Sequence, residues 1–177
     1  MNGTTNFILS KMDAKGAAYD DVLKEAQDLG FAESDPTADV EGHDVRSKIA
    51  VLSKLAFGVN VPEDKVLTSG ISKVTADDFE YAKMLKSVVK LLGVAKVIGE
   101  KKLSIFVSPV MVPATDVIST INGATNIIEI RSKSMQNTSI VGQGAGRFPT
   151  ANSVVSDVIN IALGQLGKVR FYCYLVE

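Results

Sequence analysis

The sequence has very few residues of the kinds that build cross-linked or metal-held scaffolds: one cysteine, one histidine and no tryptophan in 177 residues. The single thiol, Cys173, cannot form a disulfide within the chain, which is typical of proteins from reducing compartments. One histidine and one cysteine are too few for a usual zinc site, which takes four such ligands. We therefore expect neither disulfides nor metal to hold the fold.

The chain also lacks an excess of charge of either sign. Its formal net charge is −1, which argues against nucleic acid or a membrane surface as a partner. No apolar run reaches the roughly 18 residues that a membrane-spanning helix needs, and no signal peptide is recognisable. With 46% hydrophobic residues, the chain can bury a sizeable core unaided.

Apolar residues at helical spacing predict the first half of the fold. The helices predicted from this spacing are residues 4–12, 19–29, 40–57 and 75–93. Gly30 and Gly58 end two of them, and Thr75 is placed to cap the last. A weaker helix start lies within residues 61–66.

After Gly93 the pattern changes to that of strands. The predicted strands are residues 95–100, 102–112, 126–132, 137–143 and 168–176, with helices at 114–121 and 149–167. Residues 102–112 are nearly all apolar, so both faces of that strand should be covered. This order predicts an α+β fold with a mixed, largely antiparallel sheet and helices packed mainly on one face.

The stretch from 35 to 48 holds six charged residues and the only histidine. Asp44, Lys48, Val51 and Leu55 are spaced i, i+4, i+7 and i+11, so they share one helix face. Burial of the two apolar residues would place the charged pair at the floor of a cleft. The simpler interpretation is an i,i+4 ion pair worth about 0.2–0.5 kcal/mol.

Further acids surround the start of this helix, which are Glu33, Asp35, Asp39 and Glu41. Asp35 and Asp39 are placed to cap it, but capping does not require so many carboxylates. A lysine among them suits a site where acids bind an ammonium-bearing substrate and the lysine passes a proton. His43 lies about 140° around the helix from Lys48, so we leave it outside this mechanism.

A glycine-rich turn lies between a predicted strand and a predicted helix, in "IVGQGAGRFPTANSVV". Gly142, Gly144 and Gly146 imitate the dinucleotide-binding fingerprint, but Arg147 stands where its last glycine belongs. Only one helix and one strand follow, instead of a βαβ unit. Two interpretations stay open: a tight turn that needs positive φ, or a backbone surface that a flat cofactor ring can approach.

Three segments, in this order, resemble homoserine dehydrogenase. They are "NGTTNFIL" at 2–9, "LGFAESDPTADVEGHDVRSKIAVL" at 29–52 and "VGQGAGRFPTANSVVSDV" at 141–158. The middle segment is the most specific, because a glutamate, a D-P pair and D-x-x-x-K precede an aliphatic helix. The resemblance reaches residue 166 and is loose from 58 to 140.

The resemblance implies interconversion of L-aspartate 4-semialdehyde and L-homoserine with NAD or NADP, on the route to threonine, methionine and isoleucine. Members of the family begin with a Rossmann domain that this sequence lacks, so we expect the isolated chain to be inactive. Residues 1–166 are expected to be the catalytic and dimerisation domain of a homodimer. Residues 167–177 are similar to the strand that opens a regulatory domain. The implied location is the cytoplasm, or the plastid in a plant-type organism.

The resemblance also implies roles at matching positions. Lys48 matches the proton-donating lysine and Asp44 its partner acid. The positions matched to the substrate pocket are Glu33, Asp39, Gly3, Thr4 and Phe31, and those matched to the cofactor are Gly144, Ala145 and Gly146. Phe31 replaces a tyrosine of many members, so one hydroxyl contact is lost, and Ala38 replaces an acid of some. The usual "H-P-L" signature is missing around 114–117.

Two other functions compete with this interpretation. Strands 103–112 and 126–143 are apolar enough to pair across a two-fold axis, as in a non-catalytic oligomerisation module. The chain would also suit the substrate domain of another two-domain dehydrogenase, although the segment at 29–44 argues against that.

Overall fold

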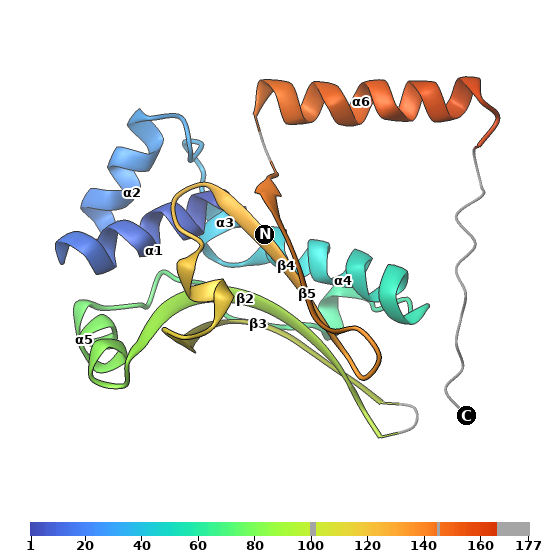
Figure 1. Cartoon of the computed structure of the whole chain (residues 1–177). Helices are drawn as coiled ribbons and strands as arrows, with labels where there is room; N and C mark the ends of the chain where they lie inside the picture. The colour runs from blue at the N-terminus through green and yellow to red at the C-terminus, as the bar shows by residue number, and fades with distance from the viewer. Residues whose placement is uncertain (100–101, 145, 166–177) are drawn as a thin grey trace.

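A computed structural model describes residues 1–99, 102–144 and 146–165 (Figure 1). The first half contains α1 (Gly3–Lys15), α2 (Tyr19–Asp28), α3 (Thr37–Val40), α4 (His43–Phe57), the 3-10 turn η1 (Glu63–Lys65), β1 (Leu67–Thr68) and α5 (Ala76–Met84). The second half contains β2 (Ser87–Ile98), β3 (Lys102–Pro113), η2 (Val117–Thr120), β4 (Thr125–Ser132), β5 (Gln136–Gln143) and α6 (Arg147–Ala162).

The strands of the described residues form two sheets. β2 and β3 pair antiparallel along all 12 residues of each, and the short β1 joins β3 in parallel. β4 and β5 form a separate antiparallel hairpin. Helices α1, α3 and α4 lie over one face of the β2–β3 ribbon (Figure 1). The predicted α+β class, with a mixed and mostly antiparallel arrangement, is confirmed.

The core lies between these helices and the ribbon. Its members are apolar side chains from every layer, including Ile8, Leu9, Val22, Ala26, Val45, Ile49, Ile71, Phe79, Val89, Leu91 and Val107. Gly93 of β2 lets α4 approach closely, because a Cβ there would lie 2.9 Å from Cγ1 of Val45 and 3.2 Å from Cβ of Ile49. Gly93 therefore marks a close packing contact within a strand, not the end of a helix.

The predicted helix over 75–93 is wrong in its second half. Its start is confirmed, because Thr75 and Asp78 form a capping box. The helix ends at Met84, and β2 begins at Ser87 after Lys86, which has φ of 50°. The same apolar residues that fit a helix pattern here pair with β3 instead, since tertiary contacts override local periodicity.

The predicted helix over 40–57 is also corrected. Gly42, with φ of 79°, separates α3 from α4. Val51 and Leu55 are 60% and 55% exposed, so the expected burial of that face is wrong. The buried face of α4 instead carries Val45 and Ile49, because these residues pack into the gap at Gly93.

Coverage of the ribbon is thinner than the sequence suggests. In β3 only Val107 and Val112 are buried, so the prediction of two covered faces is wrong. The helix predicted at 114–121 is only the 3-10 turn η2. The final strand predicted at 168–176 lies outside the described residues.

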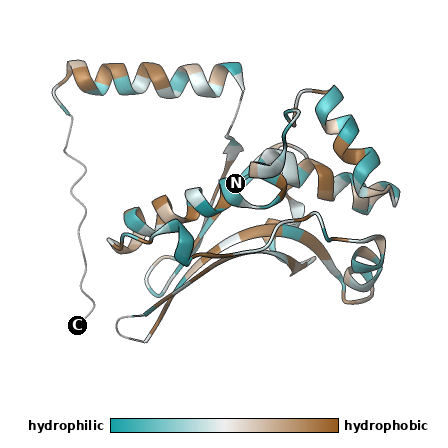
Figure 2. Cartoon of the chain, turned by 180° about the vertical axis from the view of Figure 1, so that it is seen from behind, coloured by the Kyte–Doolittle hydropathy of each residue, from teal (hydrophilic) through white to brown (hydrophobic). Residues whose placement is uncertain are grey.

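Helix α6 extends away from the body, and none of its residues from 147 to 162 is buried (Figures 1 and 2). Figure 2 shows hydrophobic residues along its length. Within the described part of the chain, no helix combines the length and apolar character needed to cross a membrane.

Candidate functional site

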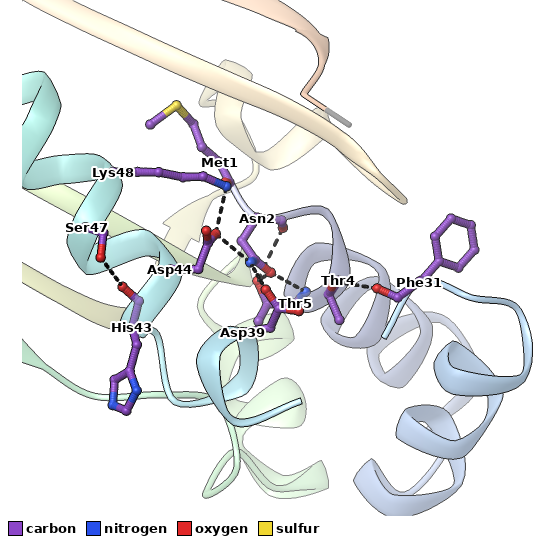
Figure 3. Close-up of polar contacts among 10 residues, drawn as sticks. All are labelled: Met1, Asn2, Thr4, Thr5, Phe31, Asp39, His43, Asp44, Ser47 and Lys48. Atoms are coloured by element: carbon purple, nitrogen blue, oxygen red, sulfur yellow. Dashed lines mark hydrogen bonds and ion pairs between the residues drawn. The ribbon is translucent and has the colours of Figure 1, made fainter. Parts of the chain in front are cut away.

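The Asp44–Lys48 pair forms as its spacing predicts, on the first turns of α4 (Figure 3). Lys48 Nζ donates to Asp44 Oδ2 at 2.7 Å and to the Met1 carbonyl oxygen at 3.0 Å. The two side chains are 29% and 46% exposed for Asp44 and Lys48 respectively. An ion pair that is partly open to water contributes little stability.

Asn2, Asp39, Asp44 and Lys48 form one charged cluster. Asn2 is the member of this cluster that was not predicted from the sequence. Its Nδ2 donates to Asp39 Oδ1 at 2.5 Å and to Asp44 Oδ2 at 2.8 Å (Figure 3). Its Oδ1 caps α1 by accepting from the backbone N–H and the hydroxyl of Thr5, both at 2.8 Å. An asparagine just before a helix signals a cap; nothing local signals the partners of its NH₂ group.

The start of the chain is also tied to the loop after α2. Thr4, itself buried, donates its hydroxyl to the Phe31 carbonyl at 2.7 Å. The Phe31 ring lies 4.8 Å from the Phe7 ring, between centroids, and remains 43% exposed. Gly3 is the first residue of α1, beside Asn2. Gly3 and Thr4 therefore adjoin the cluster, whereas the Phe31 ring points away from it (Figure 3).

The other acids are not brought into the cluster. Glu33 is exposed, and its carboxylate forms no hydrogen bond or ion pair within the described residues. Asp35 Oδ1 accepts from the Thr37 N–H at 3.1 Å, and this bonding to Thr37 lowers the pKa of Asp35. Asp35 thus accepts from the first residue of α3, whose N-cap position is Pro36. The His43 imidazole points away from Lys48 (Figure 3).

Burial at the chain start perturbs one titrating group. Burial lowers the pKa of the Met1 amine, the nearby Lys48 charge lowers it further, and the Asp44 charge opposes both. The carbonyl of the same residue accepts from Lys48. The backbone preceding α1 therefore forms one wall of the charged cluster.

Gly144 and Gly146 lie between β5 and α6, in the predicted order of strand, glycines and helix. Gly146 has φ of 121° at the N-cap of α6, a conformation that side chains disfavour. A Cβ on Gly144 would lie 2.6 Å from Asn126 Nδ2. Asn126 Oδ1 is buried and has no hydrogen-bond partner among the described residues. Ala145 lies outside the described residues.

The segment from 124 to 126 joins this turn to α1. The Ala124 carbonyl oxygen would lie 3.3 Å from a Cβ on Gly3, and Asn6 Nδ2 donates to the Thr125 carbonyl at 3.3 Å. Asn126, on the same segment, faces Gly144. The glycine turn and the capped start of α1 are thus separated by a single strand end.

A buried lysine, Lys90, ties α1 to strand β2. Lys90 of β2 is 6% exposed, and its Nζ donates to Asn6 Oδ1 and Asn122 Oδ1, both at 3.0 Å, and to the Ile121 carbonyl. Burial lowers the pKa of Lys90, while the charge of Asp13 partly offsets this. All three hydrogen-bond acceptors are neutral. Because they lie on α1 and on the loop after η2, the Lys90 amine links both to β2.

The charged cluster is partly buried, with Asn2 7% exposed and the Asp44 side chain 29% exposed. Two shallow hollows in the described structure lie elsewhere, one beside Gly70 and Met111 and one beside Ala50 and Leu55, and neither includes Asp44 or Lys48. No group of three or more histidine, cysteine or acidic residues in the described ranges is arranged to hold a metal ion.

Comparison with known proteins bears on what that site is. The family model for homoserine dehydrogenase matches residues 1–159. The homoserine dehydrogenase of Bacillus subtilis is 43% identical over 172 residues, which are 95% of this chain and 40% of that protein. The homoserine dehydrogenase of Neisseria gonorrhoeae is 44% identical over 162 residues, which are 92% and 37% of the two proteins.

Solved structures of homoserine dehydrogenases also match the fold of this chain. A homoserine dehydrogenase from Thiobacillus denitrificans matches with a TM-score of 0.89 and 41% identity, over 97% of this chain and 39% of that one. A hyperthermophilic archaeal homoserine dehydrogenase in complex with NADPH matches with a TM-score of 0.72 and 29% identity, over 92% and 46%. The chain spans about two fifths of the length of its curated relatives. By the match over residues 1–159, the chain belongs to the homoserine dehydrogenase family.

Proposed function

We propose that this chain is the substrate-binding catalytic region of a homoserine dehydrogenase, which interconverts L-aspartate 4-semialdehyde and L-homoserine with NADH or NADPH. The observation that supports this best is the contact of Lys48 with Asp44 at 2.7 Å. These are the two positions to which the family resemblance assigns proton transfer. The reaction would serve the synthesis of threonine, methionine and isoleucine.

In this proposal Lys48 manages the proton. In the reducing direction, the Lys48 ammonium gives a proton to the aldehyde oxygen, and in the oxidising direction the neutral amine accepts the alcohol proton. The nicotinamide, when bound, supplies or accepts the hydride. Because the Lys48 side chain is 46% exposed, it can exchange its proton with solvent between turnovers. Asp44 keeps the amine oriented in both states.

Acids and backbone of this chain position the substrate. Asp39 and Glu33 are proposed to bind the ammonium group of homoserine, with Gly3, Thr4 and the backbone of Phe31 lining the same pocket. Glu33 is exposed and free to turn toward a ligand. Asp39 Oδ1 is held by Asn2, which leaves its second oxygen for the substrate.

The glycines between β5 and α6 are proposed to contact the nicotinamide ring of the cofactor. Gly144 presents no side chain beside Asn126, whose buried Oδ1 lacks a partner in the described part of the chain, so an amide donor on a cofactor would satisfy it. Gly144, Ala145 and Gly146 are therefore proposed to face the nicotinamide. The choice between NAD and NADP belongs to the nucleotide-binding region.

The isolated chain should not bind NADH or NADPH at micromolar concentrations. Its described residues contain one glycine turn and no βαβ unit of the kind that holds a pyrophosphate. Isothermal titration with each nucleotide checks this. Micromolar affinity for either would contradict the proposal that the rest of the cofactor site lies on a preceding domain. The matched control is a two-domain fusion, in which the chain is joined to the Rossmann domain that precedes this region in the family.

The chain should form a homodimer through its hairpin. Ile130 and Ile140 lie on the same face of the β4–β5 hairpin and are 44% and 59% exposed, and such an apolar surface favours association. Light scattering at several concentrations should give twice the chain mass, and Ile140→Lys should give a monomer. Asn137→Lys, on the same strand, is the control and should stay dimeric. A monomer at every concentration would contradict both this proposal and the alternative of an oligomerisation module.

A further inference from the structure

Asn2 lies where three helices meet. It precedes α1, and its side chain reaches Asp39 on α3 and Asp44 on α4. The orientation of its amide is determined by the capping contact, because the Thr5 N–H can only donate and must face Oδ1. The NH₂ group therefore faces the carboxylates, and both of its protons are used.

These contacts determine where protons can lie in the cluster. Asp44 Oδ2 accepts from Asn2 and from Lys48 at the same time, so that oxygen carries no proton. Asp39 Oδ1 likewise accepts from Asn2. Two like charges held this close repel, and a shared donor offsets the repulsion without adding charge. The contact from Asn2 therefore fixes the same Asp44 oxygen that accepts from Lys48.

We propose that Asn2 is a positioning residue for the reaction: its amide holds Asp39 and Asp44 as a joined pair of carboxylates and so fixes the acid that orients Lys48. This inference rests on the proposed function. Asn2 itself need not touch the substrate, because it is 7% exposed and its amide is fully occupied by protein groups.

Capping alone does not explain this residue. A cap needs only an acceptor for the Thr5 N–H, and serine or aspartate caps a helix about as well as asparagine. Neither has an NH₂ group that can reach two carboxylates while capping. Replacing Asn2 by serine or aspartate should therefore leave the stability of α1 unchanged but remove the hydrogen bonds to Asp39 and Asp44. Such substitutions separate the capping role of Asn2 from its role in holding the two carboxylates.

The test compares Asn2→Ser and Asn2→Asp in the two-domain fusion. Asn2→Ser keeps a neutral cap, so the helix content measured by circular dichroism should hold while kcat falls by about 10- to 100-fold, the loss expected for hydrogen bonds to charged groups. Asn2→Asp keeps shape and cap but adds a third carboxylate. Its activity relative to the parent should rise as the pH is lowered, because the introduced carboxyl group again offers a donor once it is protonated.

Asn60→Asp makes the same change of charge at an exposed asparagine beyond α4 and should leave the pH profile unchanged. A second readout does not depend on activity. In the isolated chain, the Asn2 side-chain amide should give two resolved NMR signals that exchange slowly with solvent. If the parent fusion is inactive, the proposed function fails, yet these signals still test the contact. Full kcat in Asn2→Ser, or amide signals like those of an exposed asparagine, would overturn the inference.

Discussion

Replacing Lys48 by alanine should lower kcat of the two-domain fusion by roughly 10²–10⁴-fold, the range for loss of a general acid. The reason is that Lys48 is the group of the cluster that can deliver a proton, since Asp44 Oδ2 is occupied by two donors. Both directions should be affected, because the same amine gives and takes the proton. Steady-state kinetics with homoserine and with the semialdehyde measure the effect.

Two comparisons make this result specific to proton transfer. The melting temperature of Lys48→Ala should change little, because its ion pair is partly exposed and therefore screened by water. Glu33→Ala should raise KM more than it lowers kcat, since it removes binding common to the ground and transition states. Near-normal kcat in Lys48→Ala would reduce the Asp44–Lys48 pair to a helix ion pair without a catalytic role.

Replacing Gly70 by alanine should destabilise the chain by about 3 kcal/mol or more, at the upper end for overpacking. The added Cβ would lie 2.1 Å from the Val40 carbonyl oxygen and 2.4 Å from Glu41 Cα, and backbone atoms cannot rotate away as a side chain can. The adjacent Ile71 N–H donates to the same Val40 carbonyl at 2.7 Å, so the loop and the end of α3 must separate together.

Chemical denaturation and a thermal melt measure this loss, which corresponds to roughly 6–12 °C for a chain of this size. Gly142→Ala is the matched control, because no atom of the described residues lies within 4 Å of its added Cβ and its backbone is not in the left-handed region. A melting temperature of Gly70→Ala equal to that of the control would contradict this prediction. It would show that the loop and α3 can move apart at little cost in free energy. Residual activity should also fall, because Asp39 lies on α3.

Local features of the site were predictable from sequence because they depend on a few neighbouring residues. The i,i+4 spacing of Asp44 and Lys48 led directly to their contact. The cap at Thr75 and the strand–turn–helix order around Gly144 were predictable for the same reason. The roles assigned to these residues came from the family resemblance, and they remain proposals.

Features that depend on distant residues were not predictable. Residues 87–93 fit a helix pattern and became a strand only because β3 offers a partner along their full length. The buried face of α4 follows from Gly93, which is 44 positions after Ile49. Asn2 was missed because its partners lie 37 and 42 residues along the chain. In each case the structure depends on a contact between residues that are far apart in the sequence.

The ties made by Lys90 and Asn6 have a consequence for the order in which the chain can be built. Every residue of the charged cluster lies among the first 48, yet Asn6 bonds to partners 84 to 119 positions later. During synthesis from the N-terminus, the cluster leaves the ribosome long before residues 87–125, which fix α1 in place. Closing loops of that length is slow relative to helix formation. Within residues 1–125, the part that is synthesised first is thus among the last to acquire its final geometry.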